Sequence, residues 1–167
     1  LAATVVLAGG IAVHFIYAFI LTLDNYRARG KQRYAVTVQE KGVSWASKNM
    51  LVLGIIVVLG MGLHLYNFWA KMMLVELVPC AGNHHLATDG AYWIGQTFQN
   101  PVYVTIYIVW LVALWFHLTH GFWSALQSLG LSGHIWFNRW RVIGNVFVTI
   151  VVLMFLAVVL GFACGLA

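Results

Sequence analysis

Four histidines lie inside long apolar segments of the chain: His14, His64, His117 and His120. An ionisable side chain is costly to bury among apolar residues, so it marks a functional site and needs a partner. These segments contain no Asp or Glu for a proton relay, and no cysteine cluster suggests zinc or an iron–sulfur centre. The pattern favours a b-type haem, whose iron is bound by neutral imidazoles from two helices while an apolar bundle accepts the macrocycle.

Three of these histidines have a glycine four residues away: Gly10 before His14, Gly60 before His64, and Gly121 after His117. Residues four apart share one face of a helix, and a glycine there leaves room for a flat ring. His120 has Phe116 and Ser124 at these offsets. We therefore expect His117 to be the ligand, and His120 to hydrogen-bond a haem propionate or a neighbouring helix. The alternative is that the glycines only let helices pack closely and that the histidines are satisfied within the core.

Four apolar segments are long enough to hold these histidines within a membrane. Of the 167 residues, 62% are hydrophobic and 8% are charged, which is about a third of the charged fraction of a soluble domain. A helix of roughly 20 residues crosses the hydrocarbon core, and the segments of that length are 3–23, 50–70, 102–126 and 142–165. The sequence predicts an all-α fold, with one domain over residues 1–167 that forms a transmembrane helical bundle of four spans.

The basic residues lie mostly on one side of the predicted spans. Eight of the nine Lys and Arg residues lie in the links between the first two and the last two spans, and only Lys71 lies opposite. By the positive-inside rule, the links with the basic residues face the cytoplasm. The net charge of +5 therefore reflects membrane topology, and we expect no nucleic-acid partner.

The expected depths of the histidines pair two of them. His14 and His117 lie on spans of the same direction, roughly 13 Å and roughly 20 Å from their inner ends at 1.5 Å per residue, so they can meet across one haem. His64 lies in the outer half. It is either a core histidine or a ligand of a second haem whose other ligand lies outside this chain. The remaining histidines lie in a link or at an interface, where solvated side chains are expected: His84, His85 and His134.

Three runs of sequence resemble the membrane-anchor cytochrome b subunit of bacterial succinate dehydrogenase and fumarate reductase, in its single-anchor, two-haem type found in Bacteroidetes. The runs are 9–29 (GGIAVHFIYAFILTLDNYRAR), 44–69 (SWASKNMLVLGIIVVLGMGLHLYNFW) and 117–130 (HLTHGFWSALQSLG). The likeness covers essentially the whole chain and is weakest in the outer link. That family has five spans, with four haem-ligating histidines in the first four, and this chain resembles spans two to five. The resemblance therefore implies a further span, with one haem ligand, upstream of Leu1.

The resemblance also implies ligands, partners and a place in the cell. His14 and His117 would ligate the haem nearer the cytoplasm, and His64 would ligate the outer haem, giving two haem b groups in the full subunit. Partners would be an iron–sulfur subunit, a flavoprotein subunit, membrane lipid and a quinone, expected to be menaquinone. The protein would span the bacterial cytoplasmic membrane as the electron-transfer subunit of respiratory complex II, without performing succinate chemistry itself. Candidate quinone residues near the outer haem are Tyr66, Asn67, Glu76, His84 and His85.

Two other functions remain open on the sequence. One is a haem-free structural anchor for a soluble enzyme, which would leave the intramembrane histidines to find partners within the protein. The other is the cytochrome b subunit of another quinone-linked dehydrogenase, such as a hydrogenase or a formate dehydrogenase. The HGFWSA and SWAS runs favour the succinate dehydrogenase family over both.

Overall fold

The computed structural model describes residues 2–30, 44–78 and 84–166, and all their regular structure is helical. Four of the described helical segments are long and apolar enough to cross a membrane: Ala2–Arg29, Met50–Trp69, Pro101–Ser128 and His134–Ala163. The predicted all-α membrane fold is confirmed. The chain divides into two compact units, Leu1–Lys41 and Gly42–Ala167, and each is described by itself.

The first unit contains one long helix, α1 (Ala2–Arg29), which includes Gly10 and His14. The helix continues six residues past the predicted end of the apolar segment at residue 23. Its last turns are polar, and Asp24 forms an exposed ion pair with Arg27 at 3.7 Å. The helix ends at Gly30, whose φ of +60° suits a residue without a side chain.

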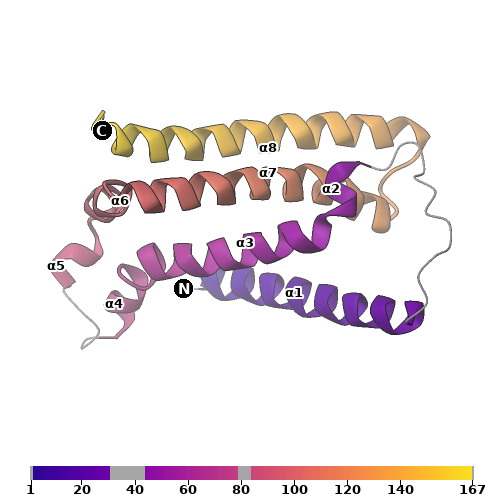
Figure 1. Ribbon diagram of the computed structural model, residues 1–167, viewed down its shortest axis with the longest axis horizontal. Coiled ribbons are helices and arrows are strands. Elements are labelled where there is room, and N and C mark those ends of the chain that lie inside the picture. The colour runs from indigo at the N-terminus through magenta and orange to yellow at the C-terminus, as the bar shows by residue number, and fades with distance from the viewer. Residues whose placement is uncertain (1, 31–43, 79–83, 167) are drawn as a thin grey trace. The chain divides into compact units, whose positions relative to one another are not determined.

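The second unit is built around α7 (Pro101–Ser128), which packs against α3 (Met50–His64) on one side and α8 (His134–Ala163) on the other (Figure 1). Shorter elements complete this unit: α2 (Trp45–Lys48), the π-helical turn η1 (Leu65–Trp69), α4 (Met73–Leu77), α5 (His84–Ala87) and α6 (Gly90–Phe98). Helix α8 begins at His134, before the predicted apolar start at residue 142. Interfacial residues form its first turns, so the helix is longer than its apolar segment.

Polar side chains cap several of these helices. Asn100 accepts a hydrogen bond from the backbone N–H of Val102 at 2.9 Å, and Pro101 occupies the first turn of α7 as expected. Asp89 accepts from the N–H of Tyr92 at 2.9 Å and so starts α6. Helix α6 packs against α7 and α8.

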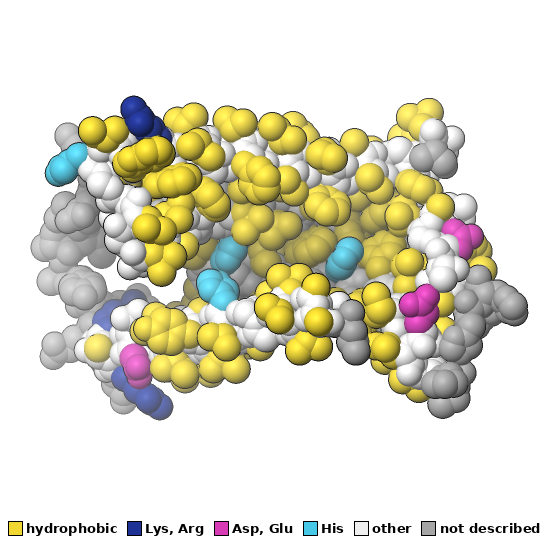
Figure 2. All heavy atoms as spheres, turned by 180° about the vertical axis from the view of Figure 1, so that it is seen from behind, with side chains coloured by type: hydrophobic (Ala, Val, Ile, Leu, Met, Phe, Trp, Pro, Cys, Tyr) yellow, Lys and Arg dark blue, Asp and Glu magenta, His cyan; other side chains and the backbone are white. Residues whose placement is uncertain are grey.

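The core of the second unit is small, and most of its long helices present apolar side chains outward. Its main buried cluster joins α6, α7 and α8: Phe98, Tyr107, Leu111, Val148, Val152 and Val159. On α8, by contrast, Phe147 is 60% exposed and Met154 is 66% exposed. Figure 2 shows hydrophobic side chains along the long helices, with the charged side chains near helix ends. Such a continuous apolar surface suits contact with lipid rather than water.

Candidate functional site

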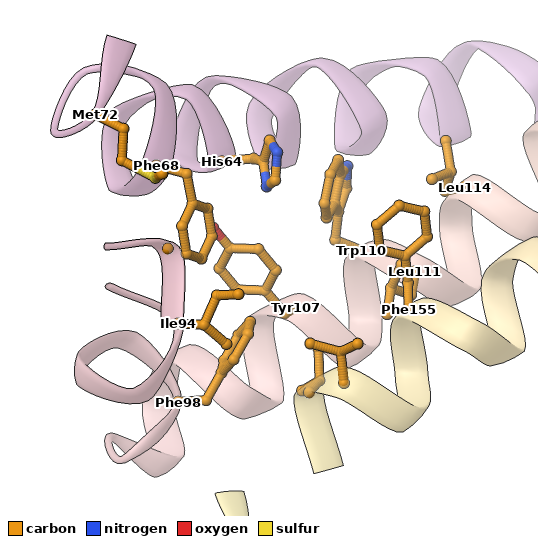
Figure 3. A pocket seen from close by; sticks show the side chains of 13 residues that line it. His64, Phe68, Met72, Ile94, Phe98, Tyr107, Trp110, Leu111, Leu114 and Phe155 are labelled. Atoms are coloured by element: carbon orange, nitrogen blue, oxygen red, sulfur yellow. The ribbon is translucent and has the colours of Figure 1, made fainter. Parts of the chain in front are cut away.

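A cavity of about 400 Å³ lies where α3, α6, α7 and α8 meet, at the end of α3 that carries His64 (Figure 3). Its walls are aliphatic and aromatic apart from the His64 imidazole and the Tyr107 hydroxyl. The lining residues are His64, Phe68, Met72, Gly90, Ile94, Phe98, Tyr107, Trp110, Leu111, Leu114, Phe155, Val158 and Val159. The cavity therefore offers a flat apolar ligand a large contact surface and very few polar contacts.

His64 is the last residue of α3, and aromatic rings surround it. Its ring centroid lies 5.1 Å from that of Phe68, 5.6 Å from that of Trp110 and 6.3 Å from that of Tyr107. The His64 Nδ1 atom is buried and has no hydrogen-bond partner among the described residues. Leaving a buried polar atom unpaired costs about 1–3 kcal/mol.

The room predicted beside Gly60 for a flat ligand ring is filled by the indole of Trp110. A Cβ atom added to Gly60 would overlap this indole ring. The Trp110 Nε1–H donates a hydrogen bond to the carbonyl of Val57 at 3.1 Å. A flat ring therefore does lie against Gly60, but it belongs to the protein itself.

His117 lies on α7 and faces a glycine that the sequence analysis did not select. A Cβ atom added to Gly54 of α3 would lie 3.6 Å from His117 Cε1, while one added to Gly121 would meet nothing within 4 Å. Gly54 and His117 are far apart in sequence, so the four-residue spacing rule had no signal for this pair. His14 and Gly10 lie in the other unit, and the pairing of His14 with His117 stays a prediction.

His120 contacts the residue that caps α2. Its Nδ1 lies 3.5 Å from Ser44 Oγ, and its ring packs edge-on against Trp123 at 4.8 Å. Ser44 Oγ also accepts a hydrogen bond from the Ser47 N–H at 3.2 Å. Its own hydroxyl proton is therefore available to the imidazole. This contact matches the expectation that His120 hydrogen-bonds a neighbouring helix.

The quinone candidates whose side chains are described do not line the cavity. Asn67 is 1% exposed, and its Nδ2 donates a hydrogen bond to Tyr107 Oη at 3.3 Å, behind the cavity wall. Tyr66 and Glu76 are exposed and do not line the cavity. The side chains of His84 and His85 lie outside the described residues. The other cavity residues are aliphatic and aromatic side chains of kinds that any apolar span contains, so the sequence carries no signal that singles them out.

The geometry does not resemble a chelating metal site. Among the described residues, no three His, Cys, Asp or Glu side chains gather closely enough to hold a metal ion. A single imidazole beside an apolar cavity can bind a metal that a flat ring, such as that of haem, already holds. The ring supplies most of the metal's ligands, so the protein supplies only the remaining ones.

Comparisons with protein-family models, with curated proteins and with solved structures found no match to this chain.

Proposed function

We propose that this chain is the membrane-anchor, di-haem cytochrome b subunit of a succinate:quinone oxidoreductase. The observation that supports this most directly is His64, whose imidazole lines a mostly apolar, aromatic cavity. The sequence resemblance described above supplies the family, and the cavity supports the cofactor class.

The residues around His64 fit a haem. The cavity of about 400 Å³ falls within the range of roughly 300–1,000 Å³ usual for small-molecule sites. Its aliphatic and aromatic walls would contact the macrocycle, and His64 would hold the iron from one face. The resemblance places the other ligand of this haem on a further span of the full subunit. When bound, haem supplies one-electron oxidation and reduction at its iron.

A second haem is proposed at His117, with His14 as the other ligand. His117 faces Gly54 on α3, and space remains open beside Gly121. Neither glycine has a side chain, so the space beside the imidazole that a bound ligand requires stays free of bulky groups. His120 then serves as a neighbour fixed by Ser44 rather than as a ligand.

The proposed role is electron transfer between an iron–sulfur subunit and a quinone, expected to be menaquinone, with a flavoprotein subunit performing the succinate chemistry. The chain would anchor these soluble subunits at the cytoplasmic side of a bacterial membrane through its basic links. Among the described residues, Lys48 at the end of α2 and Arg139 and Arg141 early in α8 belong to these links.

The decisive experiment is a reduced-minus-oxidised visible spectrum of the purified complex, with a pyridine haemochrome assay for haem type and amount. Two haem b per complex are expected. A complex without b-type absorbance would contradict the proposal and leave the haem-free anchor. Mass spectrometry of the co-purifying subunits separates the families, because hydrogenase or formate dehydrogenase subunits would replace the expected flavoprotein.

A further inference from the structure

The indole of Trp110 is locked into the interface between α3 and α7. It rests on Gly60, where a Cβ atom would overlap it, and its Nε1–H donates to the Val57 carbonyl at 3.1 Å. Both contacts are made to the backbone of α3. The position of the indole is therefore set by the helix that carries His64, and the ring has little freedom to turn.

The indole is also the ring that lies closest to parallel with the His64 imidazole. The angle between the Trp110 and His64 planes is 30°, compared with 49° for Phe68 and 63° for Tyr107. In Figure 3 the indole and the imidazole lie side by side at the cavity wall. The indole is tilted by 30° against the imidazole with ring centroids 5.6 Å apart, so it lies along one side of the ring and limits how far the imidazole can turn about its Cβ–Cγ bond.

Among the described residues, His64 has no hydrogen-bond partner of the kind that usually fixes the orientation of a metal ligand. A metal-binding histidine normally donates its second ring N–H to a carbonyl or carboxylate, and this bond sets the ring plane and tunes the metal. His64 Nδ1 is buried and has no such partner among the described residues. The orientation of the ring must then come from packing, and Trp110 is the best-anchored part of that packing.

We infer that Trp110 is the positioning residue of His64: seated on Gly60 and tied to Val57, it fixes the plane of the imidazole that binds the haem. This inference rests on the proposed function. It assigns Trp110 a role that acts through His64, so its effects should appear at one haem and spare the other.

The test uses the intact complex with Trp110→Phe, Trp110→Ala and Gly60→Ala. Gly60→Ala leaves both rings intact and displaces the indole with a single added methyl group. Trp115→Phe is the matched control, because Trp115 lies on the same helix but donates its hydrogen bond to Thr149 Oγ1 of α8 at 2.9 Å. The readouts are haem content, the midpoint potential of each haem, and the electron paramagnetic resonance signal of each ferric haem, which reports the orientation of the axial imidazoles.

Trp110→Ala is expected to weaken retention of one haem about 10-fold or more, as outer-shell changes at metal sites do. Trp110→Phe and Gly60→Ala should keep both haems while shifting the potential and resonance signal of one. Trp115→Phe should change neither. The conservative variants keep the test decisive if Trp110→Ala fails to accumulate.

Two results would overturn the inference while the proposed function stands. One is a set of variants that retain both haems with wild-type signals and potentials. The other is equal loss or equal shift of both haems, which indicates a general structural role. A wild-type complex without b-type haem would instead defeat the proposed function, and with it this inference.

Discussion

The amide of Asn67 donates a hydrogen bond to the hydroxyl of Tyr107 at 3.3 Å, joining η1 to α7. Asn67 is 1% exposed and follows His64 by three residues. A π-helical turn widens the helix at this point, and such turns recur at functional sites. The bond therefore fixes the end of α3 against α7, next to the imidazole that the proposed haem requires.

Replacing Tyr107 by Phe should destabilise the protein by about 1–3 kcal/mol, because the Asn67 amide loses its partner in a buried place. The double variant Tyr107→Phe with Asn67→Leu should lose less stability than the sum of the losses in the two single variants, since no unpaired donor remains. Unfolding of the detergent-solubilised protein, followed by circular dichroism, measures both. Strictly additive effects would show that the two side chains do not interact.

Removing each proposed ligand should remove one haem. His64→Ala and His117→Ala are each expected to halve the haem-to-protein ratio in the pyridine haemochrome assay, while His120→Ala keeps both haems and mainly shifts one midpoint potential. The physical reason is that in the proposed sites His64 and His117 would bind the iron, whereas His120 contacts Ser44. Loss of a haem in His120→Ala, with full retention in His117→Ala, would reverse the assignment of this pair.

The spans were predictable, and the helix ends were not. Apolar length alone identifies the part of a helix that crosses hydrocarbon, so four spans follow from composition. Polar and interfacial residues extend these helices without any apolar signal, as in the last turns of α1 and the first turns of α8. In the link before α7, an Asp residue suits a turn as well as a helix N-cap, and the structure shows Asp89 as the N-cap of α6.

The sequence selects candidate residues for the site but does not predict the contacts between them. The spacing of Gly60 and His64 correctly places them in one helix, but nothing in a single helix tells which side chain of another helix fills the recess. Trp110 fills it, and Gly54 meets His117, because α3 and α7 pack in a particular register. That register depends on side-chain shape across the interface, which a periodicity of 3.6 residues does not encode.

Ser44→Ala should act on both α2 and His120. The change removes the hydroxyl that accepts from the Ser47 N–H at 3.2 Å and lies 3.5 Å from His120 Nδ1. Loss of an N-cap side chain costs about 1 kcal/mol. We expect the same direction of shift in haem midpoint potential as in His120→Ala, and recovery in Ser44→Thr. A redox titration of the Ser44→Ala complex measures this shift. A midpoint potential equal to that of the wild type would show that the contact between Ser44 and His120 does not affect the haem.

Gly144→Ala should loosen the packing of α7 against α8. Gly144 is buried in α8, and an added Cβ atom would overlap the Phe122 ring of α7. Forcing an extra methyl group into a packed interface costs about 1–3 kcal/mol. A matched control is Gly62→Ala in α3, where an added Cβ atom would meet nothing within 4 Å.

The two variants are compared by unfolding in detergent, with Gly144→Ala expected to unfold first and Gly62→Ala expected to match or slightly exceed the wild type, since Ala favours helix over Gly. Because Phe122 follows Gly121 directly, Gly144→Ala should also disturb the backbone near His117 more than that near His64. We therefore expect the signal of the haem proposed at His117 to change more than that of the haem proposed at His64, in addition to the loss of stability. Equal unfolding of the two glycine variants would mean that Phe122 turns aside without cost.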